Sequence, residues 1–419
     1  MRILKGRAAE ACVQALERRG SRLDEIEPAV RRIVADVRRT GDRALLKYTK
    51  RFDGLGAKQG LRVGDSELRT AWKSAPAELR TALRMAEKNI RQFCQWQKPE
   101  EWTRSARGIA LGQLVRPLDS VGCYVPGGRF PLVSTLLMTV VPAQVAGVTN
   151  IRVVSPRPSW QVLAAAAMLG VTEFYRVGGA QAVAALAYGT ETVPRVDKIV
   201  GPGNLYVTAA KKIVSFDCAI DMLAGPTEVV IVSEKANAAF IAADLVAQAE
   251  HDPETLAVFI TTSTKVAAAV VKETEHGGRG RPPLRENAIA SKSLASRGAA
   301  LIASCKEEAF DWANRIAPEH ITVEKQDLRL VRNAGSVFIG DYSAQAAGDY
   351  ASGPNHVLPT AGAARFRGGL SVMDFVKLIT VQELSAKDLR RIAPAVIGLA
   401  ETEGLRAHAD SIRVRCASA

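Results

Sequence analysis

From about residue 118 onward, short apolar runs rich in β-branched residues alternate with helical patterns, and this alternation strongly limits the possible folds. We expect strands over residues 120–125, 151–155, 173–177, 198–200, 228–232, 257–261 and 336–339. Helices are expected between them, over residues 135–146, 160–169, 180–187 and 237–250. Strands and helices that alternate at this spacing form βαβ units with parallel strands. The sequence therefore predicts an α/β fold.

The flanking regions show helical patterns. Between Ile26 and Val37, apolar residues recur at spacings of three and four, which predicts a helix with one buried face. The pattern is helical again from Leu384 to the C-terminus. We therefore predict a helical N-terminal region over 1–117, two parallel-sheet domains over 118–230 and 231–380, and a helical tail over 381–419.

Composition indicates a globular protein of a reducing compartment. The six cysteines form no C-x-x-C pair, which argues against a zinc ribbon or a disulfide framework and favours the cytoplasm. No apolar segment near the N-terminus suggests a secretory signal, and the most apolar stretch, 133–148, is too short and too polar to span a bilayer. We therefore expect no membrane partner.

The net charge of +13 is compatible with nucleic-acid binding or with a solvated basic surface. Arginine pairs such as Arg31-Arg32 and Arg38-Arg39 are spread along helix-like segments, and the chain has no RNP motif or zinc-finger spacing. We therefore favour a solvated surface and expect no nucleic-acid partner. An anionic dinucleotide would also gain from a positive field.

Histidine is scarce, and its distribution favours a chemical role. Four of the five histidines lie close in sequence to acids or amides: His251, His320, His356 and His408. Imidazole is the commonest transition-metal ligand and the usual general base near neutral pH. Any one of these could equally be a core or surface residue, but four grouped in this way favour a catalytic or metal-binding function.

These motifs offer a mixed nitrogen and oxygen ligand set. Gln248 and His251 are three residues apart near the end of an expected helix, so their side chains share a face. Asp349 can add a carboxylate and His408 a second imidazole. Such a set, without thiolate, suits Zn²⁺ or a similar divalent ion.

A candidate acid–base pair, Glu319 and His320, follows an Ala-Pro dipeptide. A structural role for this glutamate is unfavourable because an unpaired carboxylate in a core is costly. On the turn that we expect there, the two side chains could serve two different proton transfers.

Three glycine-containing turns follow expected strands and precede helical segments, at 124–128, 177–181 and 201–204. Glycines there let the backbone approach a phosphate at a helix N-terminus, although tight βα turns also use them. None is G-x-G-x-x-G and the chain has no P-loop, so a standard Rossmann or kinase site is unsupported. Because each turn carries a polar or aromatic side chain (Tyr124, Gln181 or Asn204), we favour nucleotide binding.

The motifs resemble those of the histidinol dehydrogenase family over the whole chain. They include Tyr124-Val-Pro-Gly-Gly128, Lys198-Ile-Val-Gly-Pro-Gly-Asn204, Asp221-Met-Leu-Ala-Gly-Pro-Thr-Glu228, Gln248-Ala-Glu-His251, Asn314-Arg-Ile-Ala-Pro-Glu-His320 and Gly348-Asp-Tyr-Ala-Ser-Gly-Pro-Asn-His356. The resemblance implies two divided Rossmann-like domains, related to those of aldehyde dehydrogenases, of which the first binds NAD and the second carries the metal. It also implies a homodimer with intertwined tails and shared active sites.

The resemblance further implies a zinc-dependent enzyme of histidine biosynthesis that oxidises L-histidinol through bound L-histidinal to L-histidine with two NAD⁺. His320 would accept the hydroxyl proton and Glu319 would activate water. One Zn²⁺ per subunit would be held by Gln248, His251, Asp349 and His408. NAD would contact Tyr124, Gln181 and Asn204. The substrate would contact Thr227, Gln248, His251, His320, Asp349, Glu403 and His408, the last two from the partner subunit.

Three positions depart from the family's motifs. Thr227 stands where serine is expected, Asp252 where glycine is frequent and Pro354 where threonine is common. None of these changes removes a catalytic group, so they bear on substrate fit and not on the class of reaction.

Three other functions are compatible with parts of the sequence. A related NAD- and zinc-dependent enzyme could oxidise another small polar alcohol, but the presence of Asp349, Glu403 and His408 favours histidinol. A non-catalytic or nucleic-acid-binding protein, which the net charge suggests, would be expected to have eroded motifs, but Glu319 and His320 are intact. A metal hydrolase would leave the glycine turns unexplained, and the chain has no HExxH motif.

Overall fold

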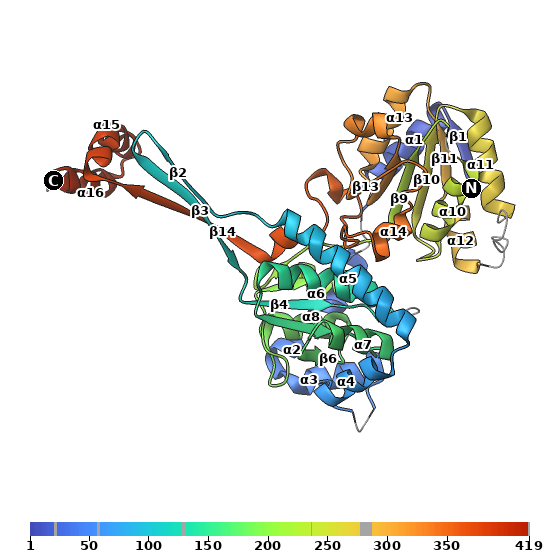
Figure 1. Ribbon diagram of the computed structural model, residues 1–419, viewed down its shortest axis with the longest axis horizontal. Helices are drawn as coiled ribbons and strands as arrows, with labels where there is room; N and C mark the ends of the chain where they lie inside the picture. Colours follow the sequence, from blue (N-terminus) through green and yellow to red (C-terminus); the bar gives the residue numbers. More distant parts are fainter. Residues whose placement is uncertain (21–22, 57–58, 128–130, 236, 277–286, 418–419) are drawn as a thin grey trace.

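The computed structural model describes residues 1–20, 23–56, 59–127, 131–235, 237–276 and 287–417. Two α/β units pack together, and a long arm projects from them to the C-terminus (Figure 1). All seven strands predicted from the sequence are present, each within two residues of its expected bounds. The prediction of an α/β fold with two parallel sheets is confirmed.

The first unit is built on a five-stranded parallel sheet. Its strand order is β6-β5-β4-β7-β8, with β4 (Ser120–Tyr124), β5 (Asn150–Val154), β6 (Glu173–Tyr175), β7 (Lys198–Val200) and β8 (Ala219–Ile220). The chain moves from β4 to one side of the sheet and later returns to the other side of β4, so the strand order reverses between β4 and β7. A reversal of this kind opens a crevice at the carboxyl ends of the strands, where α/β proteins bind ligands.

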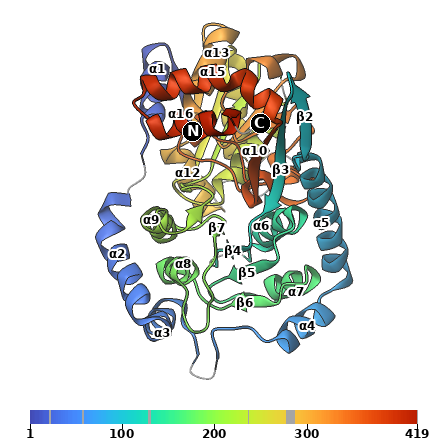
Figure 2. The ribbon, with the colours of Figure 1, turned by 90° about the vertical axis from the view of Figure 1, so that its left-hand side faces the viewer.

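Two layers of helices cover this sheet, one on each face (Figure 2). One face is covered by α8 (Gly179–Tyr188) and α9 (Leu205–Val214), backed by α2 (Leu23–Thr40), α3 (Asp42–Tyr48) and the π-helical turn η1 (Thr49–Asp53). The other is covered by α6 (Val133–Ala146) and α7 (Trp160–Met168), backed by α4 (Asp65–Ser74) and α5 (Ala77–Gln97). Helices α6, α7 and α8 are apolar on nearly all sides because they lie between the sheet and an outer helix.

The second unit contains a six-stranded parallel sheet of order β1-β11-β10-β9-β12-β13. Its strands are β1 (Arg2–Lys5), β9 (Glu228–Val232), β10 (Leu256–Thr261), β11 (Ala299–Ile302), β12 (His320–Val323) and β13 (Ser336–Ile339). One face packs on α1 (Arg7–Glu17) and α13 (Lys306–Ile316), and the other on α10 (Ala238–Ala249), α11 (Thr264–His276) and α12 (Ala288–Ser296). The short helices α14 (Gln345–Tyr350), η3 (Lys325–Leu330) and η4 (Ala363–Arg365) belong to the same half of the chain.

The N-terminal region differs from the prediction that residues 1–117 are helical. Strand β1 pairs with β11 in the second sheet, and α1 packs on α13, so the chain begins in the second unit and crosses to the first between α1 and α2. Residues 102–106 and 109–117 are also strands.

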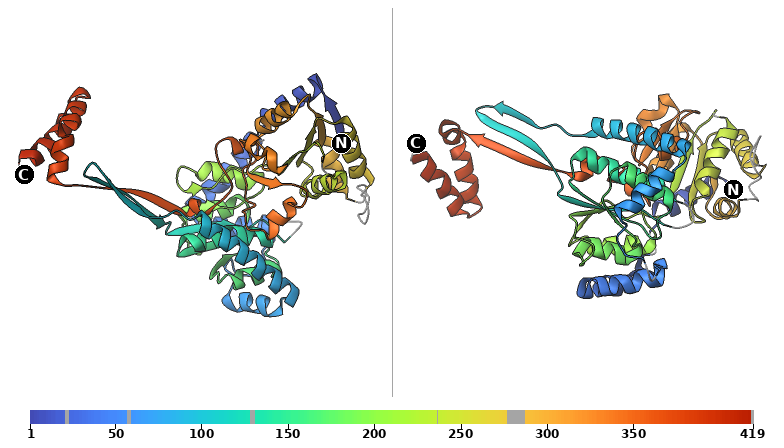
Figure 3. Two further views of the ribbon diagram at one scale, coloured as in Figure 1. Left: turned by 45° about the horizontal axis from the view of Figure 1, so that its top comes forward. Right: turned by 60° about the horizontal axis from the view of Figure 1, so that its bottom comes forward.

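The arm is a three-stranded antiparallel ribbon that carries two helices at its tip. Strand β3 (Ile109–Pro117) pairs with β2 (Trp102–Ala106) on one side and with β14 (Val376–Leu384) on the other. Helices α15 (Ala386–Thr402) and α16 (Arg406–Ala417) follow, and they lie far from both sheets, as both views of Figure 3 show. The 3₁₀ turn η5 (Val372–Phe375) leads into β14. No helix in the described ranges is long and apolar enough to cross a membrane.

Candidate active site

Glu319 and His320 lie at the amino edge of the second sheet, beside the start of β9. We expected the pair on a turn, and this is wrong for His320, which is the first residue of β12 and pairs with Val229 of β9. Both side chains are buried. The rigid strand fixes the imidazole more firmly than a turn would, as suits a catalytic group.

A chain of hydrogen bonds joins Glu319 to the end of α10. Glu319 Oε2 accepts hydrogen bonds from the Thr227 hydroxyl and, at 2.9 Å, from the backbone N–H of Glu228. The Thr227 hydroxyl in turn accepts one from Gln248 Nε2. Since the amide nitrogen of Gln248 is occupied in this way, its carbonyl oxygen is the atom left to bind a ligand.

His320 is held by its Nδ1 atom and leaves Nε2 available. Nδ1 lies 3.1 Å from the carbonyl oxygen of Glu228, which can only accept, so Nδ1 carries the proton. Nε2 is buried without a hydrogen-bond partner among the described residues. Asp349 Oδ1 lies 3.4 Å from it, at an ion-pair distance. A buried, unpaired nitrogen at the candidate site indicates an absent partner.

Burial and neighbouring charges shift the pKa values of both Glu319 and His320. Burial raises the pKa of Glu319 to about 7, although the charge of His320 and the hydrogen bonds from Thr227 and Glu228 oppose that change. Burial also opposes protonation of His320, but Glu319 and Asp349 outweigh it and raise the pKa of the imidazole to about 9. Titratable groups perturbed by burial and by specific charged neighbours are typical of functional sites.

Three of the predicted metal ligands come from the elements around this pair. Gln248 is buried on the last turn of α10, His251 follows that helix, and Asp349 lies on α14. Burial opposes ionisation of Asp349, but the charges of His320, His356 and His251 lower its pKa. Within the described residues, no three histidine, cysteine, aspartate or glutamate side chains are placed to hold a metal by themselves.

The predicted residues of the tail are not brought to this site within one chain. Glu403 follows α15 and His408 lies on α16, so both are on the arm, far from β12 (Figure 1). His356, which we singled out without a role, does lie at the site. Its Nδ1 atom is 2.8 Å from the carbonyl oxygen of Asp349 and its Nε2 atom 3.3 Å from the Thr135 hydroxyl, so it fixes α14 against α6.

The predicted NAD contacts gather at the carboxyl edge of the first sheet, around its switch point. Tyr124 ends β4, Gln181 lies in the first turn of α8, and Asn204 caps α9 by accepting hydrogen bonds from two backbone N–H groups. The Tyr124 hydroxyl accepts a hydrogen bond from Gly179 N–H at 3.0 Å. Tyr124 therefore links the ends of two neighbouring segments at the crevice, and Asn204 fixes the start of α9 there.

The glycines of these turns are needed for close packing between the turns. A Cβ atom on Gly127 or Gly178 would lie within 2.4 Å of Pro156, and one on Gly201 would lie 2.2 Å from the carbonyl oxygen of Tyr124. Gly201 also has a φ of +109°, which favours glycine. The turns after β4, β5, β6 and β7 thus pack directly on one another.

Asp53 also belongs to this region, although we did not predict a role for it. It ends the π-helical turn η1, is buried, and its Oδ2 atom accepts hydrogen bonds from Gly178 N–H at 2.9 Å and Gln181 Nε2 at 3.2 Å. Burial raises its pKa. In the sequence, Asp53 is marked only by its position directly before Gly54. Its contacts could not be predicted, because its partners lie more than a hundred residues away.

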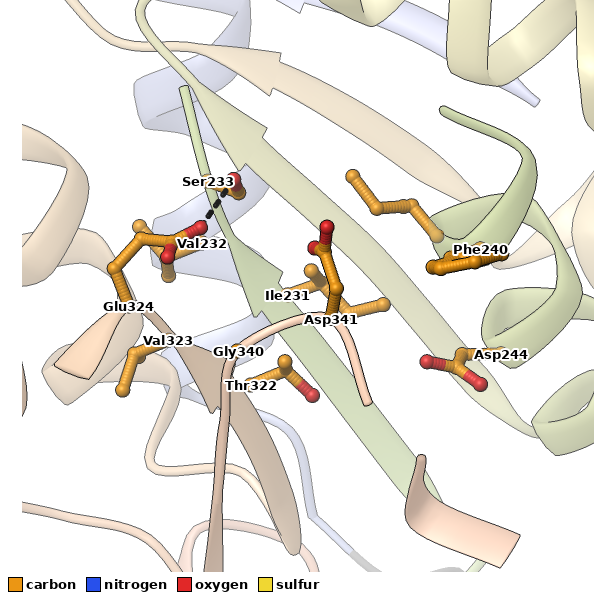
Figure 4. Close-up of a pocket in the computed structure, with 11 residues that line it drawn as sticks. Ile231, Val232, Ser233, Phe240, Asp244, Thr322, Val323, Glu324, Gly340 and Asp341 are labelled. Atoms are coloured by element: carbon orange, nitrogen blue, oxygen red, sulfur yellow. Dashed lines mark hydrogen bonds between the residues drawn. The ribbon is translucent and has the colours of Figure 1, made fainter. Parts of the chain in front are cut away.

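A separate pocket lies at the carboxyl edge of the second sheet, at the opposite end from His320 (Figure 4). Three acids, Asp244, Glu324 and Asp341, are among its lining residues, and Glu324 accepts a hydrogen bond from Ser233 at 3.2 Å. None of the predicted site residues lines it. Its negative charge disfavours a dinucleotide phosphate.

Comparison with known proteins gives a consistent result. The family model for histidinol dehydrogenase matches residues 16–416. The chain is 46% identical over 414 residues to the histidinol dehydrogenase of Methanothermobacter thermautotrophicus, covering 96% of each protein. It is 45% identical over 403 residues to that of Synechococcus sp., covering 93% of this chain and 92% of the relative. The crystal structure of histidinol dehydrogenase from Elizabethkingia anophelis superposes with a TM-score of 0.94 at 35% identity, covering 100% of this chain and 98% of the other.

Proposed function

Because the chain belongs to the histidinol dehydrogenase family, oxidoreductases of histidine biosynthesis, we propose that it oxidises L-histidinol through bound L-histidinal to L-histidine. In this proposal the two hydrides would pass to two NAD⁺, and one Zn²⁺ per subunit would help to orient the substrate. The observation that carries this proposal is the buried pair of Glu319 and His320. Nε2 of His320 forms no hydrogen bond with any described residue and lies 3.4 Å from Asp349 Oδ1.

NAD binding at the first sheet is supported by its topology. The order of strands reverses between β4 and β7. Tyr124 is the last residue of β4, and Asn204 follows β7 at the start of α9. Gln181 joins them from the next turn. Open α/β sheets bind dinucleotides at such a crevice, and the positive net charge of the chain favours an anionic cofactor.

The donor set at the second sheet fits a zinc ion. The carbonyl oxygen of Gln248, the imidazole of His251 and the carboxylate of Asp349 would hold it, with His408 of a second chain as a further ligand. When bound, the ion supplies a fixed Lewis acid that orients the polar groups of the substrate. Thr227 keeps the hydroxyl that links Gln248 to Glu319, so its extra methyl group leaves this network intact.

The acid–base steps fall to Glu319 and His320. His320 accepts the hydroxyl proton of the alcohol at Nε2 as the hydride leaves to NAD⁺. When Asp349 is engaged as a ligand, it stabilises the imidazolium less, and burial then favours the neutral imidazole that a base requires. Glu319, whose pKa of about 7 suits a base near neutral pH, activates the water that attacks the aldehyde before the second hydride transfer.

We expect the purified protein to form about two NADH for each L-histidine produced from L-histidinol, since the alcohol and the aldehyde each lose one hydride. A strong chelator should abolish turnover, and added Zn²⁺ should restore it. NADH is followed by absorbance and histidine by amino-acid analysis. The His320→Ala variant, purified in the same way, is the control for contaminating dehydrogenases. Absence of NADH with L-histidinol would overturn the proposal.

The position of the arm supports a homodimer with shared sites. Glu403 and His408 lie far from Asp349 of their own chain, and β2 is exposed along its whole length. Apolar side chains of the arm such as Leu378, Ile379 and Leu399 are also solvent-exposed in a single chain. A second copy whose arm exchanges with the first would bury these surfaces and deliver the two tail residues.

Complementation between inactive variants tests this arrangement. His320→Ala damages the core half of the site and His408→Ala the tail half, so each homodimer should be nearly inactive. A random mixture formed by co-expression should regain about a quarter of the wild-type activity, because half of the dimers would have one intact site of two. If each site is built from one chain alone, the mixture will stay as inactive as its components.

A further inference from the structure

Arg19 makes a two-pronged ion pair with Glu228 in the interior of the second unit. Its Nε and Nη2 atoms donate to Glu228 Oε1 and Oε2, both at 2.7 Å. Its remaining Nη1 atom donates to the carbonyl oxygens of Leu16 at 2.5 Å and Ile316 at 2.9 Å. The two side chains are only 17% and 4% exposed. A bidentate pair of this kind fixes both position and orientation.

Glu228 is the residue whose backbone holds both members of the acid–base pair. Its N–H donates to Glu319 Oε2 at 2.9 Å, and its carbonyl oxygen accepts from His320 Nδ1 at 3.1 Å. Its side chain, besides binding Arg19, accepts a hydrogen bond from Ala361 N–H at 2.9 Å. Ala361 has a left-handed φ of +53°, so this loop depends on such contacts to keep its shape.

Arg19 lies in the connection that leaves α1 of the second unit for α2 of the first. Its guanidinium therefore joins this connection directly to the end of α13 and the start of β9, and the Glu228 carboxylate joins these in turn to the loop at 361. Without it, the buried Glu228 carboxylate would lack its cation and would have to turn or draw in water, because a buried unpaired charge is costly. Either change moves the backbone atoms on which Glu319 and His320 rest.

We propose that Arg19 is a positioning residue for the acid–base pair, acting through the side chain and then the backbone of Glu228. It touches neither the predicted substrate contacts nor the predicted NAD contacts. The inference rests on the proposed function for its kinetic consequences, whereas its structural consequence, displacement of Glu319 and His320, stands by itself.

The test compares Arg19→Met and Arg19→Lys with Arg18→Met, a control in which the adjacent, exposed arginine is replaced. We expect Arg19→Met to lower kcat with histidinol about 100-fold, as a displacement near 1 Å can, while KM for NAD⁺ stays unchanged. Arg19→Lys should lose less, because it keeps the charge but not the fork. Arg18→Met should match the wild type.

A double variant, Arg19→Met with Glu228→Gln, separates positioning from stability. It removes both charges, so the midpoint of thermal unfolding should recover, but kcat should stay low because the fork is still missing. Recovery of kcat together with stability would show a merely structural role and overturn the proposal. So would a folded Arg19→Met variant with wild-type kcat.

A crystal structure of Arg19→Met provides a result independent of activity. We expect changes in the distances now 2.9 Å from Glu228 N to Glu319 Oε2 and 3.1 Å from His320 Nδ1 to Glu228 O. Unchanged distances would overturn the inference, whatever the substrate is. If instead the wild type and Arg18→Met both fail to oxidise histidinol, the proposed function fails, and these distances alone decide the role of Arg19.

Discussion

Replacing His320 by alanine should lower kcat for L-histidinol roughly 100- to 10,000-fold, the usual contribution of a positioned general base. The reason lies in the geometry of the imidazole. Glu228 fixes its Nδ1 proton, so Nε2 is the ring atom that can accept a proton. Nε2 is buried 3.4 Å from Asp349 Oδ1, without a hydrogen bond to any described residue. Turnover of histidinol is measured by NADH formation, and circular dichroism checks that the variant is folded.

Glu319→Gln should affect a different step of the reaction from His320→Ala. If His320 serves the alcohol and Glu319 the hydration of the aldehyde, Glu319→Gln should still release the first hydride but form little histidine. A single turnover should then give about one NADH per site instead of two. Equal loss of both hydrides in the two variants would contradict the division of roles between Glu319 and His320.

Much of the fold follows from local patterns in the sequence. Buried parallel strands are continuous β-branched runs, so 228–232 and 257–261 were evident. Other strands leave no such signal. Arg2–Lys5 contains two apolar residues, and β2 is exposed on both faces, so neither shows the alternation of a half-buried strand. Ala299–Ile302 is a short apolar run, which periodicity cannot distinguish from a helix segment.

The residues of the candidate site likewise fall into those that could be predicted from the sequence and those that could not. Residues in compact motifs, such as Gln248 with His251, could be predicted because the chemistry and the spacing lie in one segment. Residues that act through distant partners could not: Arg19 meets Glu228 at a separation of 209 positions. Asp53 meets Gln181 at a separation of 128. Only the tertiary packing within each unit reveals these contacts.

The buried pair Lys211 and Asp221 should be the most sensitive electrostatic contact for stability. Their side chains are 2% and 0% exposed and form a direct ion pair. Lys211 Nζ also donates to the carbonyl oxygen of Gly201 at 3.0 Å, and Asp221 Oδ2 accepts from Gly201 N–H at 2.7 Å. The pair therefore closes the turn that leads to Asn204.

Lys211→Met should lower the free energy of unfolding by about 3–5 kcal/mol, because it leaves the Asp221 carboxylate buried without a counter-charge. The neighbouring Lys212 offers a matched control, since its pair with Glu27 is 43% exposed on the lysine side. Lys212→Met should cost much less than Lys211→Met, because solvent screens an exposed ion pair. Denaturant unfolding measures both variants. Adding Asp221→Asn to Lys211→Met should recover part of the loss, since the uncompensated charge is then gone. Equal effects of the two lysine variants would mean that burial of the Asp221 charge does not govern this turn.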